Sequence, residues 1–123
     1  MRRGNCWSAA ILAILGAGCV SARAEYIPVV PAPRQLQLHG AAQVQTFLVT
    51  PPGRPHLDIG MLHVATCGQT LEQTMVLLRT TAGQRGCDAV VITNLNVFEH
   101  GRGTCTSGSI IDGSCEVYTD APP

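Results

Sequence analysis

The sequence has 123 residues, of which 13% are charged, and its formal net charge is zero. That length favours a single small domain, because it leaves no room for two hydrophobic cores. Lysine is absent and the arginines form no basic stripe, which excludes the usual kind of nucleic-acid-binding surface.

Residues 1–24 have the pattern of a bacterial secretory signal peptide. The chain starts with a basic segment, and the stretch from Ala9 to Val20 is apolar or small and carries no charge. This stretch is roughly a dozen residues, shorter than the ~20 that a stable transmembrane helix needs. Ala22 and Ala24 then form the small-x-small pattern that a signal peptidase accepts, which predicts cleavage before Glu25. The sequence therefore predicts export to the periplasm or the exterior.

A second processing route ends at Cys19. The segment Leu15-Gly16-Ala17-Gly18-Cys19 resembles a bacterial lipobox, in which the cysteine is lipidated and becomes the new N-terminus. It departs from that motif because Leu15 lies one position too far upstream and Gly16 replaces a larger aliphatic residue. On this route a lipid anchors the protein to the outer membrane. The alternative is that Cys19 is a small apolar residue of the signal.

Four cysteines are left for disulfides after either route, at positions 67, 87, 105 and 115. An even set of cysteines in a small exported domain predicts two disulfides, each stabilising the fold by roughly 2–4 kcal/mol. Three pairings are possible and spacing does not choose among them. From residue 25 onward, five arginines stand against eight carboxylates, so the mature protein carries a net charge of −3 with histidine neutral.

Residues 25–56 are expected to form a proline-rich tether. Prolines remove hydrogen-bond donors and favour extended backbone, and six of them occur in this segment, at positions 28, 31, 33, 51, 52 and 55. Within the segment, residues 43–49 are rich in β-branched and aromatic side chains. They predict a short edge strand.

The folded domain is expected to span residues 57–119. An apolar stretch from Leu57 to Ala65 predicts its first strand. The segment Thr70-Leu71-Glu72-Gln73 then has the form of a capping box, which predicts a helix with Thr70 as its N-cap. One apolar stripe follows at Leu71, Met75, Leu78 and Ala82, and Gly83 or Gly86 can end the helix.

Two further strands are expected after the helix. Residues 89–93 form a continuous apolar, β-branched stretch, which predicts a strand covered on both faces at the centre of the sheet. Residues 99–113 are dense in Gly, Ser and Thr and predict a long loop or hairpin connection, and residues 115–119 predict a short last strand. The fold class is therefore α+β, a two-layer sandwich of one helix on a three- to four-stranded sheet in β-α-β-β order.

The domain resembles the RcsF-like and YbjQ-like families of small envelope proteins. The resemblance rests on a strand that ends in a turn at Cys67, the helix, the segment Gly86-Cys87-Asp88-Ala89-Val90-Val91-Ile92 and a terminal strand that carries a cysteine. It covers residues 57–119. It implies a disulfide-bonded periplasmic domain on a tether that acts through protein partners in the envelope.

The disulfide pairing that we expect takes this resemblance into account. Cys67, Cys105 and Cys115 fall where the RcsF-like pattern has cysteines, whereas Cys87 has no counterpart there. The family's connectivity therefore does not transfer as a whole. The expected pairs are Cys67–Cys105 and Cys87–Cys115.

Catalytic and metal-binding motifs are not found. No two cysteines have the Cys-x-x-Cys spacing of a thiol oxidoreductase, and no nucleophile elbow or phosphate-binding loop occurs. A metal could draw only on His63, Cys67, His100 and Cys105, and oxidised cysteines cannot ligate as thiolates. We therefore expect no enzyme activity, no cofactor and no metal site.

Two functions follow as hypotheses. The first is an exported, non-enzymatic envelope protein, a stress-sensing or structural module that acts through protein partners, with contact to a membrane only through a lipid on Cys19. The alternative is a small-ligand or metal-binding module of the YbjQ-like type.

Overall fold

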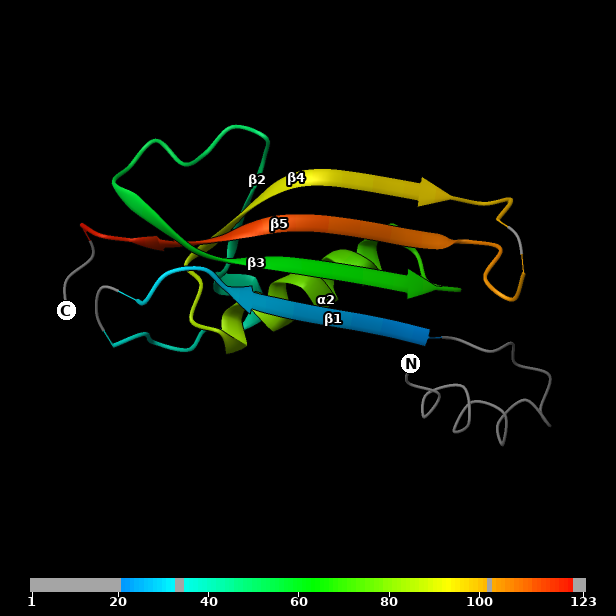
Figure 1. Cartoon of the computed structure of the whole chain (residues 1–123), viewed down its shortest axis with the longest axis horizontal. Coiled ribbons are helices and arrows are strands. Elements are labelled where there is room, and N and C mark those ends of the chain that lie inside the picture. Colours follow the sequence, from blue (N-terminus) through cyan, green and yellow to red (C-terminus); the bar gives the residue numbers. More distant parts are fainter. Residues whose placement is uncertain (1–20, 33–34, 102, 121–123) are drawn as a thin grey trace.

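The computed structural model describes residues 21–32, 35–101 and 103–120. Its elements are β1 (Ser21–Pro28), a short 3-10 helix η2 (Ala41–Gln43), β2 (Gln45–Leu48), β3 (His56–Cys67), α2 (Leu71–Gln84), β4 (Ala89–Phe98) and β5 (Gly108–Tyr118). The five strands form one sheet in the order β1-β3-β5-β4-β2, and α2 lies on one side of it (Figure 1). Only β2 and β4 are parallel among the neighbouring pairs. The α+β class is confirmed, and the sheet has five strands rather than three or four.

The first strand and the helix of the predicted domain form as expected. The Thr70 hydroxyl accepts from the Gln73 amide, and the Gln73 side chain accepts from the Thr70 amide, which completes the capping box. The helix ends at Gln84, and Gly86 follows with φ of +81°, a left-handed backbone conformation that favours glycine. Gly86 rather than Gly83 therefore ends the helix.

The hydrophobic core lies between α2 and the sheet. The buried face of α2 carries Thr74, Leu78 and Ala82. The Thr74 hydroxyl lies 2.6 Å from that of Thr66 on β3, which shows that Thr66 faces the helix. Because side chains alternate along a strand, Leu62 and Val64 face α2 too, and Met61 and His63 lie on the other side. We call that other side the open face.

The predictions for the C-terminal half are partly wrong. The strand β4 is buried on both faces from Ala89 to Ile92, as expected, but it lies second from the edge and β5 occupies the centre. The strand β5 also begins at Gly108, within the predicted loop, and runs for 11 residues. Gly108 and Gly113 suit a central strand because the neighbouring strands approach them closely. A Cβ on Gly108 would overlap the carbonyl oxygen of Thr66.

The predicted tether over residues 25–56 is wrong, because this segment contains part of β1, the helix η2 and the strand β2 of the folded domain. Residues 25–28 form the second half of β1, which pairs antiparallel with β3. Val44 is only 4% exposed and belongs to the core cluster, and β2 extends the opposite edge of the sheet as predicted. Pro31, Pro51, Pro52 and Pro55 lie in connections between the elements, and the domain begins well before Leu57.

Gly83 shows how closely this N-terminal segment packs on α2. The amide of His39 donates to the carbonyl oxygen of Gly83 at 3.0 Å, and a Cβ on Gly83 would overlap the carbonyl oxygen of His39. In an exposed helix, Gly→Ala stabilises by about 1 kcal/mol. Here we expect Gly83→Ala to destabilise the protein by at least about 1 kcal/mol, because the backbone of His39 must move. Urea unfolding of the variant checks this, and a gain in stability would contradict it.

The predicted signal peptide reaches into the sheet. Residues 1–20, with Cys19, lie outside the described residues, whereas the predicted cleavage site between Ala24 and Glu25 lies in the middle of β1. Within the described part of the chain, no helix has the length and hydropathy required to span a membrane.

Candidate functional site

Two disulfides join distant parts of the chain, and their surroundings differ. Cys87 is bonded to Cys115 and Cys67 to Cys105, with Cα–Cα distances of 5.4 and 5.6 Å, so the expected pairing is confirmed. Cys87 and Cys115 are fully buried. The other bridge is partly exposed and ties the connection after β4 to the end of β3. Two disulfides in a domain this small indicate an oxidising, exported compartment.

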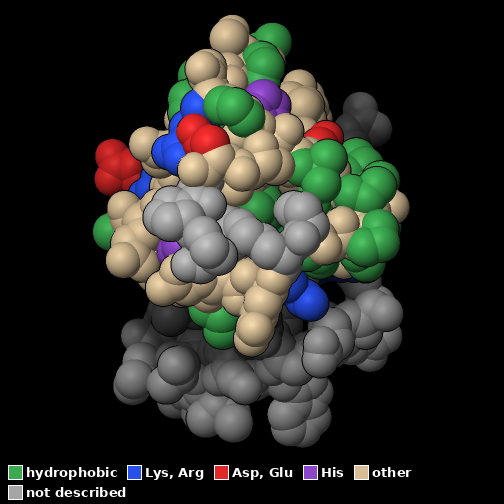
Figure 2. Space-filling view, turned by 90° about the vertical axis from the view of Figure 1, so that its left-hand side faces the viewer, with side chains coloured by type: hydrophobic (Ala, Val, Ile, Leu, Met, Phe, Trp, Pro, Cys, Tyr) green, Lys and Arg blue, Asp and Glu red, His purple; other side chains and the backbone are tan. Residues whose placement is uncertain are grey.

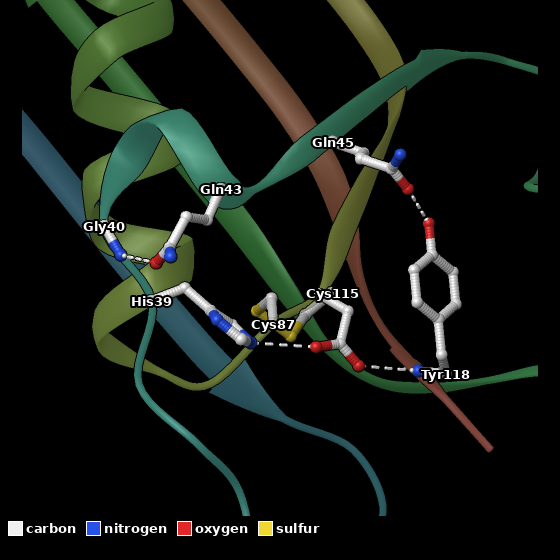
Figure 3. A network of polar contacts seen from close by, with 8 residues as sticks. His39, Gly40, Gln43, Gln45, Cys87, Cys115 and Tyr118 are labelled. Atoms are coloured by element: carbon white, nitrogen blue, oxygen red, sulfur yellow. Dashed lines mark hydrogen bonds and ion pairs between the residues drawn. A yellow bond between two sulfur atoms is a disulfide. The ribbon is translucent and has the colours of Figure 1, made fainter. Parts of the chain in front are cut away.

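A polar network surrounds the buried disulfide (Figure 3). The Asp88 carboxylate accepts from His39 Nε2 at 2.8 Å and from the backbone amide of Tyr118 at 2.8 Å. The Tyr118 hydroxyl bonds to Gln45 Oε1. Asp88 thus links the segment before β2, the start of β4 and the end of β5. Because its partners include a backbone amide, this carboxylate serves to hold the fold together.

An arginine from the β2–β3 connection closes the same end of the molecule. The Arg54 guanidinium lies 3.8 Å from the ring centre of Tyr118 and donates to the Asp120 carboxylate at 2.6 and 3.0 Å. In Figure 2, which views this end, basic and acidic side chains lie side by side. The bond to Arg54 lowers the pKa of the Asp120 carboxyl. Because Arg54 and Asp120 are exposed, the pair itself adds little stability.

Glu116 is a buried carboxylate beneath this connection. On β5 it belongs to the open face, yet it is only 3% exposed, and Pro52 of the β2–β3 connection is buried as well. Its Oε1 atom has no hydrogen-bond partner among the described residues and lies 3.7 Å from His56 Nε2. Asp58 is its direct partner across the strands. Burial raises the pKa of the Glu116 carboxyl, Asp58 raises it further, and His56 lowers it in part.

A second polar cluster lies further along the open face. His63 Nδ1 donates to Asp112 Oδ1 at 2.5 Å, and the Asn94 side-chain amide donates to Asp112 Oδ2 at 3.1 Å. The hydrogen bond to His63 lowers the pKa of the Asp112 carboxyl, and the bond to Asn94 lowers it further by a smaller amount. Burial raises this pKa, but the net shift is downward. An imidazole held in this way could accept a proton at Nε2. In the described ranges, however, no hydroxyl or thiol is bonded to that nitrogen, so the cluster lacks a nucleophile.

The two carboxylates predict opposite pH dependences. Glu116 has a raised pKa in the folded protein, so its contribution to stability is full at acid pH and is lost as pH rises through that pKa. We therefore expect Glu116→Gln to be more stable than the parent at pH 7, by about 1 kcal/mol, since a buried carboxylate charge that lacks a hydrogen bond at Oε1 is removed. This advantage should shrink toward pH 4. Urea unfolding between pH 4 and pH 8 measures it.

Asp112→Asn is the matched control for this experiment. Because the Asp112 pKa is lowered in the folded protein, its stabilisation is present above the ordinary aspartate pKa and is lost as pH falls. The Asn variant should therefore be less stable than the parent throughout pH 4–8 and approach it only below about pH 4, so its series is extended to pH 2. Equal pH profiles for the two variants would contradict the assignment of the buried charge to Glu116.

The four residues considered for a metal site do not form a common ligand set in the structure. Cys67 and Cys105 are bonded to each other, His63 is held by Asp112, and His100 lies exposed after the end of β4. Among the residues that the structure describes, no group of three or more His, Cys, Asp or Glu side chains could hold a metal ion. Sequence reasoning missed the roles of His39, Asp88 and Glu116. No motif marks them, because their partners come from other strands.

Comparison with known proteins identifies the fold but no family. No family model matches the chain, and no curated protein matches it. The crystal structure of the Francisella virulence factor FvfA is similar, with 12% identity and a TM-score of 0.50; the match covers 76% of this chain and 97% of that one. At this identity the likeness shows the fold alone. The chain is therefore a disulfide-bonded α+β domain with the fold of FvfA, and its resemblance to the RcsF-like and YbjQ-like families stays a prediction.

Proposed function

We propose that this protein is a non-enzymatic module of the bacterial cell envelope, anchored by a lipid on Cys19, that acts by contacting another envelope protein through the open face of its sheet. The two disulfides support the exported compartment. The strand β1 supports the anchor, and exposed apolar side chains on the open face support the contact. A role in stress sensing follows only from the resemblance to the RcsF-like family.

The lipid anchor gains its support from the bounds of β1. Residues 21–24 pair with Val64–Cys67, so cleavage after Ala24 would remove half of the strand. Processing at Cys19 keeps all of β1, because the new N-terminus lies two residues before Ser21. The fold thus favours the lipobox route over cleavage between Ala24 and Glu25.

The open face carries apolar side chains that no part of the described chain covers. Ile27 on β1 and Met61 on β3 are direct cross-strand partners, and they are 61% and 55% exposed. The His63–Asp112 cluster lies beside them, because Glu25 pairs with His63 two residues along, which is the next pair on the same face of the sheet. Adjacent exposed apolar and charged side chains on one face are typical of protein contact surfaces.

The mass of the mature protein tests the anchor. We expect a chain that starts at Cys19, carries acyl groups and has two disulfides, each adding two mass units on reduction. Purification from the membrane fraction followed by intact mass spectrometry, unreduced and reduced, measures all three. An unmodified N-terminus at Glu25 would refute the anchor and leave the contact hypothesis untouched.

Site-specific photocrosslinking tests the contact. A photoreactive residue at Met61 should capture one envelope protein, which mass spectrometry identifies and reciprocal crosslinking confirms. The same residue at Val76, which is 49% exposed on α2 away from the open face, is the matched control. Equal capture at both positions, or none at Met61, would refute a specific contact through the open face.

A further inference from the structure

The strand β4 extends beyond the strand that covers its outer edge. Its neighbour β2 pairs only with residues Ala89–Ile92, whereas β4 continues to Phe98. Val49 follows β2 with φ of 66°, and its amide still donates to the Ile92 carbonyl before the chain leaves the sheet. Along residues 93–98, the outer edge of β4 thus has no strand partner within the described ranges.

This uncovered edge carries exposed apolar side chains. Leu95 and Val97 pair with Ile111 and Ser109 of β5, so they lie on the helix side of the sheet. The helix packs mainly on β3 and β5 and less on β4, and Leu95 and Val97 of β4 are 42% and 50% exposed. A long edge with exposed apolar side chains is a template for another strand.

The backbone groups of the same two residues point outward. Ile92 directs its carbonyl away from β5, toward Val49, and its partner on β5 is Gly113. A bulge at residue 93 shifts the register, so that Leu95 pairs with Ile111. Ile111 lies two residues from Gly113, and the backbone groups of Leu95 therefore point away from β5, as those of Ile92 do. Leu95 and, two residues further on, Val97 therefore direct their N–H and C=O groups outward, where no strand of the described residues pairs with them.

We infer that the edge of β4 pairs with the same edge of a second copy of this chain. In an antiparallel pair, the side chains of directly opposite residues lie on the same face of the sheet. Two copies of β4 meet this condition only if the pairing is symmetric about one residue and not about the midpoint between two residues. In a register centred on Asn96, Leu95 of each copy lies opposite Val97 of the other copy. The two residues then exchange both backbone hydrogen bonds. The two apolar pairs adjoin on the helix side.

Self-pairing fits the length and the charges of this edge. The register places residue 99 opposite residue 93, so Glu99 meets Thr93 and no like charges face each other. This register also pairs all the residues of β4 that β2 leaves uncovered, from 93 to 98. Each outward polar group of Leu95 and Val97 finds a partner of the opposite kind, and no other molecule is needed to complete the edge.

The opposite edge of the sheet is protected, which makes β4 the site of pairing. Its strand β1 carries the exposed ion pair of Arg23 and Glu25 and ends at Pro28. Charged side chains and proline on an edge strand oppose pairing with another chain. This inference concerns a different surface from the open face and does not depend on the proposed function.

Introduced cysteines test the register in the purified protein with both native disulfides intact. Asn96 of the two copies would lie in a non-hydrogen-bonded pair with Cα atoms about 4.5 Å apart, within the about 4.4–6.8 Å that a disulfide spans. Asn96→Cys should therefore give a disulfide-linked dimer, with the bridge mapped to position 96 by mass spectrometry. Asn94→Cys is the matched control, because its two copies would lie more than about 13 Å apart. Equal crosslinking of both variants would overturn the register.

Sedimentation equilibrium over a concentration series tests the edge without new cysteines. Val97→Pro removes an outward N–H without removing a bond to β5, and Leu95→Lys places a charge in the apolar pair. Each should weaken dimerisation at least about tenfold. Ile27→Lys, on the opposite edge strand, should leave it unchanged. A monomer at every concentration, as expected if this edge binds a different protein, or a dimer weakened only by Ile27→Lys, would overturn the inference.

Discussion

Replacing both Cys87 and Cys115 by alanine is expected to destabilise the protein by about 2–5 kcal/mol, enough to unfold much of it at 37 °C. Both residues are fully buried and belong to the core cluster. Their loss removes a link between the start of β4 and the centre of the sheet, and it leaves a cavity beside the Asp88 network. Thermal unfolding followed by circular dichroism measures the effect.

The double replacement of Cys67 and Cys105 by serine is the matched comparison. This bridge closes a longer segment, 38 residues against 28, so loop entropy alone predicts that its loss costs at least as much. Because it lies partly exposed outside the core, we expect a smaller loss of stability and a folded domain. If the serine variant proves the less stable one, burial is not what distinguishes the two bridges.

A chain that begins at Glu25 is expected to be less stable than one that begins at Ser21 by about 1–3 kcal/mol, because backbone hydrogen bonds of β1 are lost. Residues 21–24 pair with Val64–Cys67 on β3. Without them the second half of β3 becomes an edge of the sheet. Urea unfolding of the two chains measures the difference, and unchanged stability would remove the structural argument for processing at Cys19.

A substitution separates backbone pairing from side-chain effects in this experiment. Arg23→Ala, in the chain that begins at Ser21, removes the ion pair with Glu25, whose side chains are 59% and 46% exposed. Such a surface pair contributes at most about 1 kcal/mol. The substituted chain should therefore stay close to its parent. A loss as large as that of truncation would assign the effect to the charge.

Local patterns predicted the elements whose residues interact within a few positions of each other. The helix follows from the capping box at Thr70 and the apolar stripe through Leu78, both of which are short-range features. The strand over residues 57–65 follows from a continuous apolar stretch. The short edge strand β2 was found even among prolines, because four residues suffice for an edge.

The errors arose where a residue's environment is set by a distant strand. The Gly- and Ser-rich start of β5 has the composition of a loop, yet it forms a central strand because β3 and β4 approach it from both sides. The cleavage site expected after Ala24 is a different case and stays a prediction: the first half of β1 has the small side chains of a signal-peptidase site, and these also suit a strand paired with β3. Composition does not distinguish the two.

The sequence by itself determined the α+β class, the start of α2, the four-cysteine framework and the excess of carboxylates over arginines from residue 25 onward, because these depend on composition and short spacings. Only the tertiary structure decided that residues 25–56 are part of the domain. It also placed Asp88 between His39 and Tyr118, buried Glu116 and left the edge of β4 open. Each of these depends on contacts between segments far apart in the chain, and such contacts are set by the packing of the whole sheet.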